Sequence, residues 1–147
     1  MNKKIRETYA DASKSAAKLK ELELLLQKEN PEAASTKAYL GAVAALKGNF
    51  SFFPAMKLSY FWEASRYFEE AIRQEPNNLE AIFLRFTVEC GVPAIMSYAL
   101  HLQEDKKQII TLLKSQEVES YFKKAIIKFL TESGKCTLAE KKELQGM

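Results

Sequence analysis

The feature that most constrains this chain is one spacing of small, aromatic and proline residues, Ala64-x3-Phe68-x2-Ala71-x4-Pro76. Ala64, Phe68 and Ala71 are four and three residues apart, so they share one face of a helix. Two small side chains on that face let a neighbouring helix approach closely, and the phenylalanine ring fills the space between them. Pro76 ends the helix, because proline lacks a backbone N–H and clashes with the preceding turn. The pattern predicts a helix packed closely on a second one.

Apolar residues recur at helical spacing along the rest of the chain. Asn30 is predicted to cap a helix, Gly48 to end it, and Asn77 with Glu80 to start another in a capping-box pattern. No alternating run of β-branched residues predicts a strand. We therefore expect an all-α fold, a stack of antiparallel hairpins with about seven to eight helices. They span about residues 3–29, 32–47, 55–75, 78–90, 93–102, 104–114 and 117–133, with a last short helix after Thr137-x-x-Glu140.

Composition bounds the class of protein. The 147 residues are 47% hydrophobic and 28% charged, which is typical of a soluble globular protein. A chain of this length buries about 70% of its unfolded surface as one domain, so residues 1–147 are predicted to form a single domain. A net charge of +3 is too small to indicate nucleic-acid binding.

The sequence predicts no membrane span, and it is compatible with more than one cellular compartment. No run of 18 apolar residues predicts a transmembrane helix. Glu7, Asp11 and Lys14 occupy the place of the apolar region of a signal peptide. The literal sequence thus indicates a cytoplasmic protein, whereas removal of a leader before Met1 would make it periplasmic or exported.

The spacing around Phe68 resembles the second helix of a tetratricopeptide (TPR) repeat, and Leu40-Gly41 resembles the Leu-Gly pair of the first helix. The two helices lie about eleven residues further apart than in a repeat of about 34 residues, so 48–57 is predicted to be an insertion. The resemblance covers about residues 37–90. Phrases such as Phe53-Pro54-Ala55-Met56-Lys57 and Pro76-Asn77-Asn78-Leu79-Glu80 are similar to a family of small bacterial TPR-like proteins of unassigned function, whose members often carry an export signal.

The resemblance implies a peptide-binding groove on the first helices of the repeats. Some TPR proteins hold a peptide's terminal carboxylate there with Lys and Asn, and this chain has Ala38, Ala42 and Leu84 at the equivalent positions. That carboxylate-binding set is therefore absent. The alternative is that the same residues pack against the terminal helices. The candidate groove residues are Ala38, Ala42, Glu80, Phe83 and Thr87.

A second candidate is an aromatic cluster in the predicted insertion, formed by Phe50, Phe52 and Phe53. Exposed, it would be an interaction patch. Folded back, it would cover the hairpin core and supply large buried area. We favour the folded-back arrangement, because an insertion between packed helices has a core to lie on.

Arg85 is a third candidate, because it lies between apolar residues in the middle of a predicted helix. A buried arginine needs a carboxylate partner, which Glu80, Glu89 or Asp105 could supply. We expect an ion pair, with Asp105 or Glu80 as the more informative partner. The alternative is an anionic ligand bound by Arg85.

Catalytic and metal-binding patterns are lacking. His101 is the only histidine and has no second ligand at metal-binding spacing, and Cys90 and Cys136 match no ligand motif. No glycine-rich phosphate loop or paired carboxylates are found. The sequence thus predicts neither an enzyme nor a cofactor or metal site.

The sequence favours a non-catalytic TPR-like protein–protein interaction module that binds a protein or peptide. The alternative is a structural or self-associating helical protein without a ligand groove, which would form a homo-oligomer. An open concave surface with exposed Phe83 would favour the first, and a groove filled by terminal helices the second. A deep pocket around Arg85 would instead indicate a small-molecule binder or an enzyme.

Overall fold

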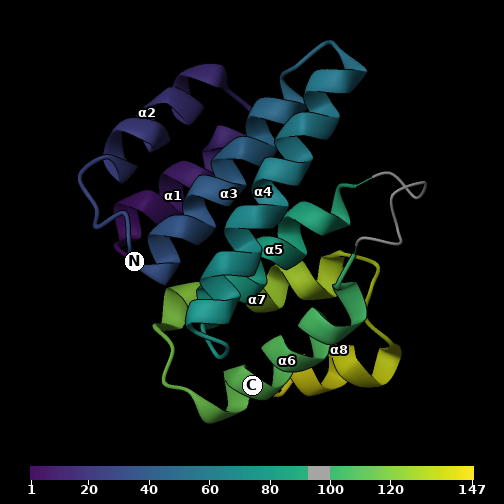
Figure 1. Cartoon of the computed structure of the whole chain (residues 1–147). Coiled ribbons are helices and arrows are strands. Elements are labelled where there is room, and N and C mark those ends of the chain that lie inside the picture. The colour runs from purple at the N-terminus through teal and green to yellow at the C-terminus, as the bar shows by residue number, and fades with distance from the viewer. Residues whose placement is uncertain (93–99) are drawn as a thin grey trace. The chain divides into compact units, whose positions relative to one another are not determined.

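The computed structural model describes residues 1–92 and 100–147, and this part of the chain is helical without strands (Figure 1). The predicted fold class, all-α, is confirmed. The predicted helix over 93–102 lies mostly outside the described residues. Eight helices are described: α1 (Lys3–Ala12), α2 (Ala16–Leu26), α3 (Ala34–Asn49), α4 (Pro54–Gln74), α5 (Leu79–Cys90), α6 (Leu102–Ser115), α7 (Ser120–Glu132) and α8 (Leu138–Gln145).

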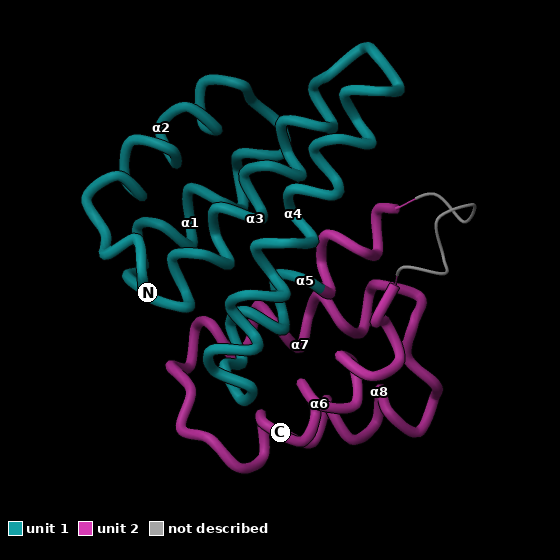
Figure 2. The backbone as a smooth tube through the Cα atoms, in the orientation of Figure 1, with its two compact units in different colours: residues 1–85 teal, residues 86–147 magenta. Residues whose placement is uncertain are grey.

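The chain divides into two compact units, residues 1–85 and 86–147 (Figure 2). The boundary falls inside α5, so this helix contributes residues to both units. In the first unit, α1 packs on α2, α2 on α3, and α3 on α4. In the second unit, α7 packs on α8, and the ring of Phe86 on α5 meets the edge of Phe129 on α7 at 6.1 Å between centroids.

The α3–α4 hairpin contains the Ala64-x3-Phe68-x2-Ala71 spacing. Ala64, Phe68 and Ala71 are all buried on α4. A Cβ atom added to Gly41 of α3 would lie 3.1 Å from the carbonyl oxygen of Ala64 and 3.2 Å from the Phe68 ring. The predicted Leu-Gly pair therefore lies against the predicted Ala-Phe pair, and only a glycine at position 41 lets the two helices approach this closely.

Several predicted helix ends are wrong. The segment 3–29 is two helices, because the chain turns at 13–15 and the Ser15 side chain caps α2 by accepting from the N–H of Lys18. Asn30 forms a local turn to Glu32 instead of a cap, and α3 begins at Ala34. α3 continues through Gly48 to Asn49, where Gly48 had been expected to stop it.

Two other helix ends carry local signals. Thr137 and Glu140 form the expected reciprocal capping box at the start of α8. Gly134 follows α7 with a φ of 75°, the left-handed conformation that glycine adopts at helix ends. Both signals act over a few residues, so their outcome does not depend on distant packing.

Candidate functional site

The α3–α4 connection exposes a cluster of large apolar side chains, which we call the hairpin tip: Phe50, Phe52, Phe53, Met56, Leu58 and Trp62. Phe52 is 93% exposed and Phe53 69% exposed. The prediction that this aromatic cluster folds back over the core is wrong. Leu58 and Trp62 are exposed too, although they lie at helical spacing with the buried Phe68.

The part of the hairpin tip in the loop 50–53 and the first turn of α4 is exposed because the two helices of the hairpin differ in length. α3 has 16 residues and α4 has 21, which corresponds to about 24 Å and about 31 Å. The predicted insertion over 48–57 does not form a separate loop, because it lengthens the helices and leaves only 50–53 between them. Gly48, near the end of α3, meets Tyr60 and Lys57 of α4. The first turn of α4 therefore extends past α3 and has no helix of the hairpin opposite it (Figure 1).

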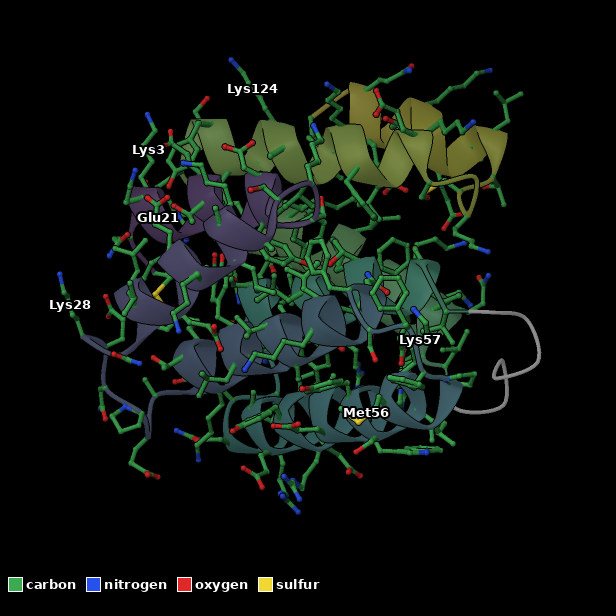
Figure 3. The ribbon with its side chains drawn as sticks, turned by 90° about the horizontal axis from the view of Figure 1, so that it is seen from above. Lys3, Glu21, Lys28, Met56, Lys57 and Lys124 are labelled. Carbon is green, nitrogen blue, oxygen red and sulfur yellow. The ribbon has the colours of Figure 1, made fainter. Side chains whose placement is uncertain are left out.

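The charge near the hairpin tip is small. Lys57 extends from α4 toward α3, where its Nζ donates to the carbonyl oxygen of Gly48 at 3.2 Å (Figure 3). Lys47 is paired with Glu23 of α2 at 2.6 Å, and this hydrogen bond raises the pKa of Lys47. The sequence has no acidic residue between Glu32 and Glu63. The tip is therefore an apolar surface next to one lysine that no carboxylate neutralises.

The candidate groove residues do not form an open surface. Ala38, Ala42, Glu80 and Phe83 are buried, and Thr87, in the second unit, is half-buried. In the first unit, α1 lies against α3 at this place, since the edge of the Tyr9 ring meets the ring of Tyr39 at 5.9 Å between centroids. The alternative of packing against a terminal helix accounts for these residues in the first unit.

Glu80 is the centre of a buried polar network. Arg6 of α1 donates from Nε to Oε2 of Glu80 at 2.6 Å, and the hydroxyl of Tyr39 on α3 donates to the same oxygen at 2.9 Å. Burial, followed by the nearby negative charge of Glu80, raises the pKa of Tyr39 far above its ordinary value. Asn78, not Asn77, caps α5 by accepting from the N–H of Ala81. Glu80 is thus a buried acceptor that joins α1, α3 and α5, a role its sequence position did not indicate.

Arg85 and Asp105 are both buried. Of the other acids proposed for Arg85, Glu80 binds Arg6 and Tyr39. Glu89 accepts from the backbone N–H of His101 at 2.8 Å and pairs with its Nδ1 at 2.7 Å. Arg85 and Asp105 belong to different units, and their pairing stays a prediction.

The second unit contains a buried lysine that the sequence did not single out. Nζ of Lys106 on α6 lies 2.9 Å from Glu140 on α8 and donates to the carbonyl oxygen of Lys135 at 2.9 Å. The backbone N–H of Thr137, followed by Lys106, holds the pKa of Glu140 below its usual range. Lys106 therefore joins α6 to α8, and its contacts with Glu140 and the Lys135 carbonyl oxygen stabilise the packing of the second unit.

Neither cysteine has the properties of a nucleophile. Cys90 and Cys136 are both half-buried free thiols. Burial raises the pKa of Cys90 to about 11 and also raises the pKa of Cys136. A thiol whose pKa is raised is mostly protonated at neutral pH and reacts slowly.

Metal sites and membrane spans were both searched in residues 1–92 and 100–147. In these ranges, no group of three or more His, Cys, Asp or Glu side chains is arranged to hold a metal ion. No helix in the same ranges is both long enough and apolar enough to cross a bilayer. The hairpin tip, with its six exposed large apolar side chains, is the candidate functional site.

Comparison with known proteins gives no match: no family model, no curated protein and no solved structure is significantly similar to this chain.

Proposed function

We propose that this chain is a non-catalytic protein–protein interaction module with TPR-like hairpins, and that it binds its partner through the hairpin tip. The exposure of six large apolar side chains between residues 50 and 62 carries the proposal. Phenylalanine and tryptophan supply most of the binding energy in protein interfaces when a partner covers them. An exposed apolar surface of this kind marks an interaction site.

Two observations separate this proposal from binding in a TPR groove. The candidate groove residues of the first unit are buried, and the ring of Tyr9 occupies the face of α3 that a groove ligand would need. The close packing of Gly41 on Ala64 and Phe68 supports the TPR-like description of the hairpin itself. The proposed module thus keeps a TPR-like hairpin and binds with its end.

Site-specific crosslinking in the native host tests the proposal. Phe52 is replaced by the photoreactive p-benzoylphenylalanine, and Leu138 of α8, which is 71% exposed, is replaced in the same way as a matched control. We expect protein adducts from position 52 and not from position 138. Excess wild-type protein should compete for the partner and lower the amount of adduct from position 52, whereas excess F52S/F53S double variant should not. Equal adducts from both positions, or none from position 52, would overturn the proposal.

The alternative of a self-associating protein without a ligand groove is favoured by one observation, the burial of Ala38, Ala42, Glu80 and Phe83. The two functions use the same surface and differ only in the partner. The mass of the adduct from position 52 distinguishes them, because a second copy of the chain gives an adduct of twice its mass.

A further inference from the structure

The outer face of α4 changes character along its length. Ala55, Leu58 and Trp62 are three and four residues apart, so they share the face of α4 that points away from α3, and all three are exposed. The next positions on this face are Arg66, Glu69 and Arg73, which are exposed and charged. The apolar surface therefore ends one turn after Trp62. Such a limit is typical of an interface bordered by a polar rim.

The exposed area of the tip is comparable to the largest apolar patch on a typical monomer. At about 200 Å² for each fully exposed ring, the exposed fractions of Phe50, Phe52, Phe53 and Trp62 amount to about 500 Å². Met56 and Leu58 add to this area. The largest apolar patch on a typical monomer covers about 300–600 Å². Two such tips facing each other bury about 1,000 Å² from the rings alone, which reaches the lower limit for a specific interface.

The charge of the tip argues for an uncharged partner surface. Lys57 is the one lysine there without a carboxylate, and its Nζ is held by the carbonyl oxygen of Gly48. Lys47 is neutralised by Glu23. Attraction to an anionic membrane needs a cluster of about four or more basic residues, which the described tip lacks. A second tip meets the requirement, because its surface is apolar and its Lys57 is held by the carbonyl oxygen of Gly48.

From the limited apolar face, its area and its low charge, we propose that the hairpin tip binds the hairpin tip of a second copy of this chain and forms a two-fold homodimer. The inference rests on the proposed function, because it keeps binding through the hairpin tip, and it joins that function to the self-associating alternative by naming a second copy of the chain as the partner. In the dimer, Phe52 and Phe53 of each copy are covered by residues 50–62 of the other. Leu58 and Trp62 of the two α4 helices lie at the contact.

Sedimentation equilibrium of the purified full chain over the micromolar range tests the inference. We expect wild type to associate to a dimer, and the F52S/F53S variant to dimerise at least about tenfold more weakly. Both phenylalanines are exposed, so these changes should leave the fold intact, as far-UV circular dichroism checks. The control L138S removes an equally exposed leucine of α8 and should dimerise like wild type.

Crosslinking of the purified protein locates the contact. With p-benzoylphenylalanine in place of Phe52, the dimeric adduct should map to residues 50–62 of the second copy. An adduct that maps to another segment, or equal dimerisation of wild type and F52S/F53S, would overturn tip-to-tip pairing.

Two further outcomes separate failure of this inference from failure of the proposed function. If wild type stays monomeric while position 52 forms adducts with another protein of the host, the inference that the partner is a second copy of the chain is wrong and the proposed function stands. If wild type stays monomeric and floats with vesicles of phosphatidylglycerol and phosphatidylcholine, and F52S/F53S does not, the tip binds a membrane surface. That last result would overturn both.

Discussion

At the scale of single residues, Glu80 illustrates what a long-range contact does to a local signal. Its position three residues after Asn77 resembles a capping box, yet its carboxylate accepts from Arg6, which is 74 positions away along the chain, and from Tyr39. A buried carboxylate needs such donors, because burying a charge without partners is costly. The Glu80 side chain therefore joins three helices, α1, α3 and α5, and does not cap the start of α5.

Tyr39 provides a prediction about alkaline stability. Its pKa is raised in the folded protein, so Tyr39 stays protonated at a pH where an unfolded tyrosine, with a pKa of about 10, ionises. The unfolded chain then binds fewer protons than the folded one, and the free energy of unfolding falls as the pH rises above about 10. The stabilising contribution is fully present below that pH.

Substitution Y39F should remove this alkaline loss of stability. At neutral pH the substitution should lower the free energy of unfolding by about 2 kcal/mol, because Glu80 loses one hydrogen bond. Urea unfolding from about pH 8 to about pH 11 measures both effects, and Y60F, at a half-buried tyrosine outside the Glu80 network, is the control. The same pH dependence in Y39F and wild type would contradict the assignment.

At the scale of helices, some signals that span only a few residues act as predicted, and others do not. The capping box of α8 is local and was predicted, and the left-handed Gly134 at the end of α7 is local as well. The break at 13–15 was missed, because the apolar spacing continues across it from Ala12 to Leu19. Ser15 was the available signal, since serine is a preferred N-cap residue.

The α3–α4 hairpin provides a prediction about two glycines of one helix. In G41A, the added Cβ would lie 3.1 Å from both the Ala64 carbonyl oxygen and the Tyr67 Cβ, atoms that move only if the backbone shifts. The strain of about 1–3 kcal/mol exceeds the gain in helix propensity of about 1 kcal/mol. G41A should therefore destabilise the protein.

The matched variant is G48A, whose Cβ has one tight contact, 3.2 Å from Tyr60 Cβ. It should be closer to neutral than G41A, because α4 needs a smaller shift there. Urea unfolding of both variants measures the difference. If G48A were the more destabilising of the two, the prediction that α3 and α4 approach each other most closely at Gly41 would be wrong.

At the scale of the whole molecule, the boundary between the two units lies inside α5. No loop separates them at this point, so separate unfolding of either unit would have to break a continuous helix. Residues 1–147 were predicted to be a single domain, and we expect the chain to unfold in one cooperative transition.

Trp62, the one tryptophan of the chain, reports on the first unit, so a core change in the second unit tests cooperativity. Ile126 of α7 is fully buried, and I126A should cost about 2–5 kcal/mol. In one transition, the urea midpoint from Trp62 fluorescence shifts together with that from far-UV circular dichroism. An unchanged Trp62 midpoint, with only part of the circular dichroism signal shifted, would indicate that the units unfold separately. L138S on the surface of α8 should shift neither.

The all-α class, the shared face of Ala64, Phe68 and Ala71 on α4, and the capping box of α8 were predictable from the sequence. Helical periodicity and caps depend on residues within one or two turns. The exposure of the hairpin tip depends instead on how the helices pack. Leu58 and Trp62 have the spacing of core residues, but a side chain is buried only where another element lies opposite it. Both lie on the face of α4 opposite to Ala64, Phe68 and Ala71, where α3 does not pack, and the spacing within α4 does not show which of its faces a neighbour covers.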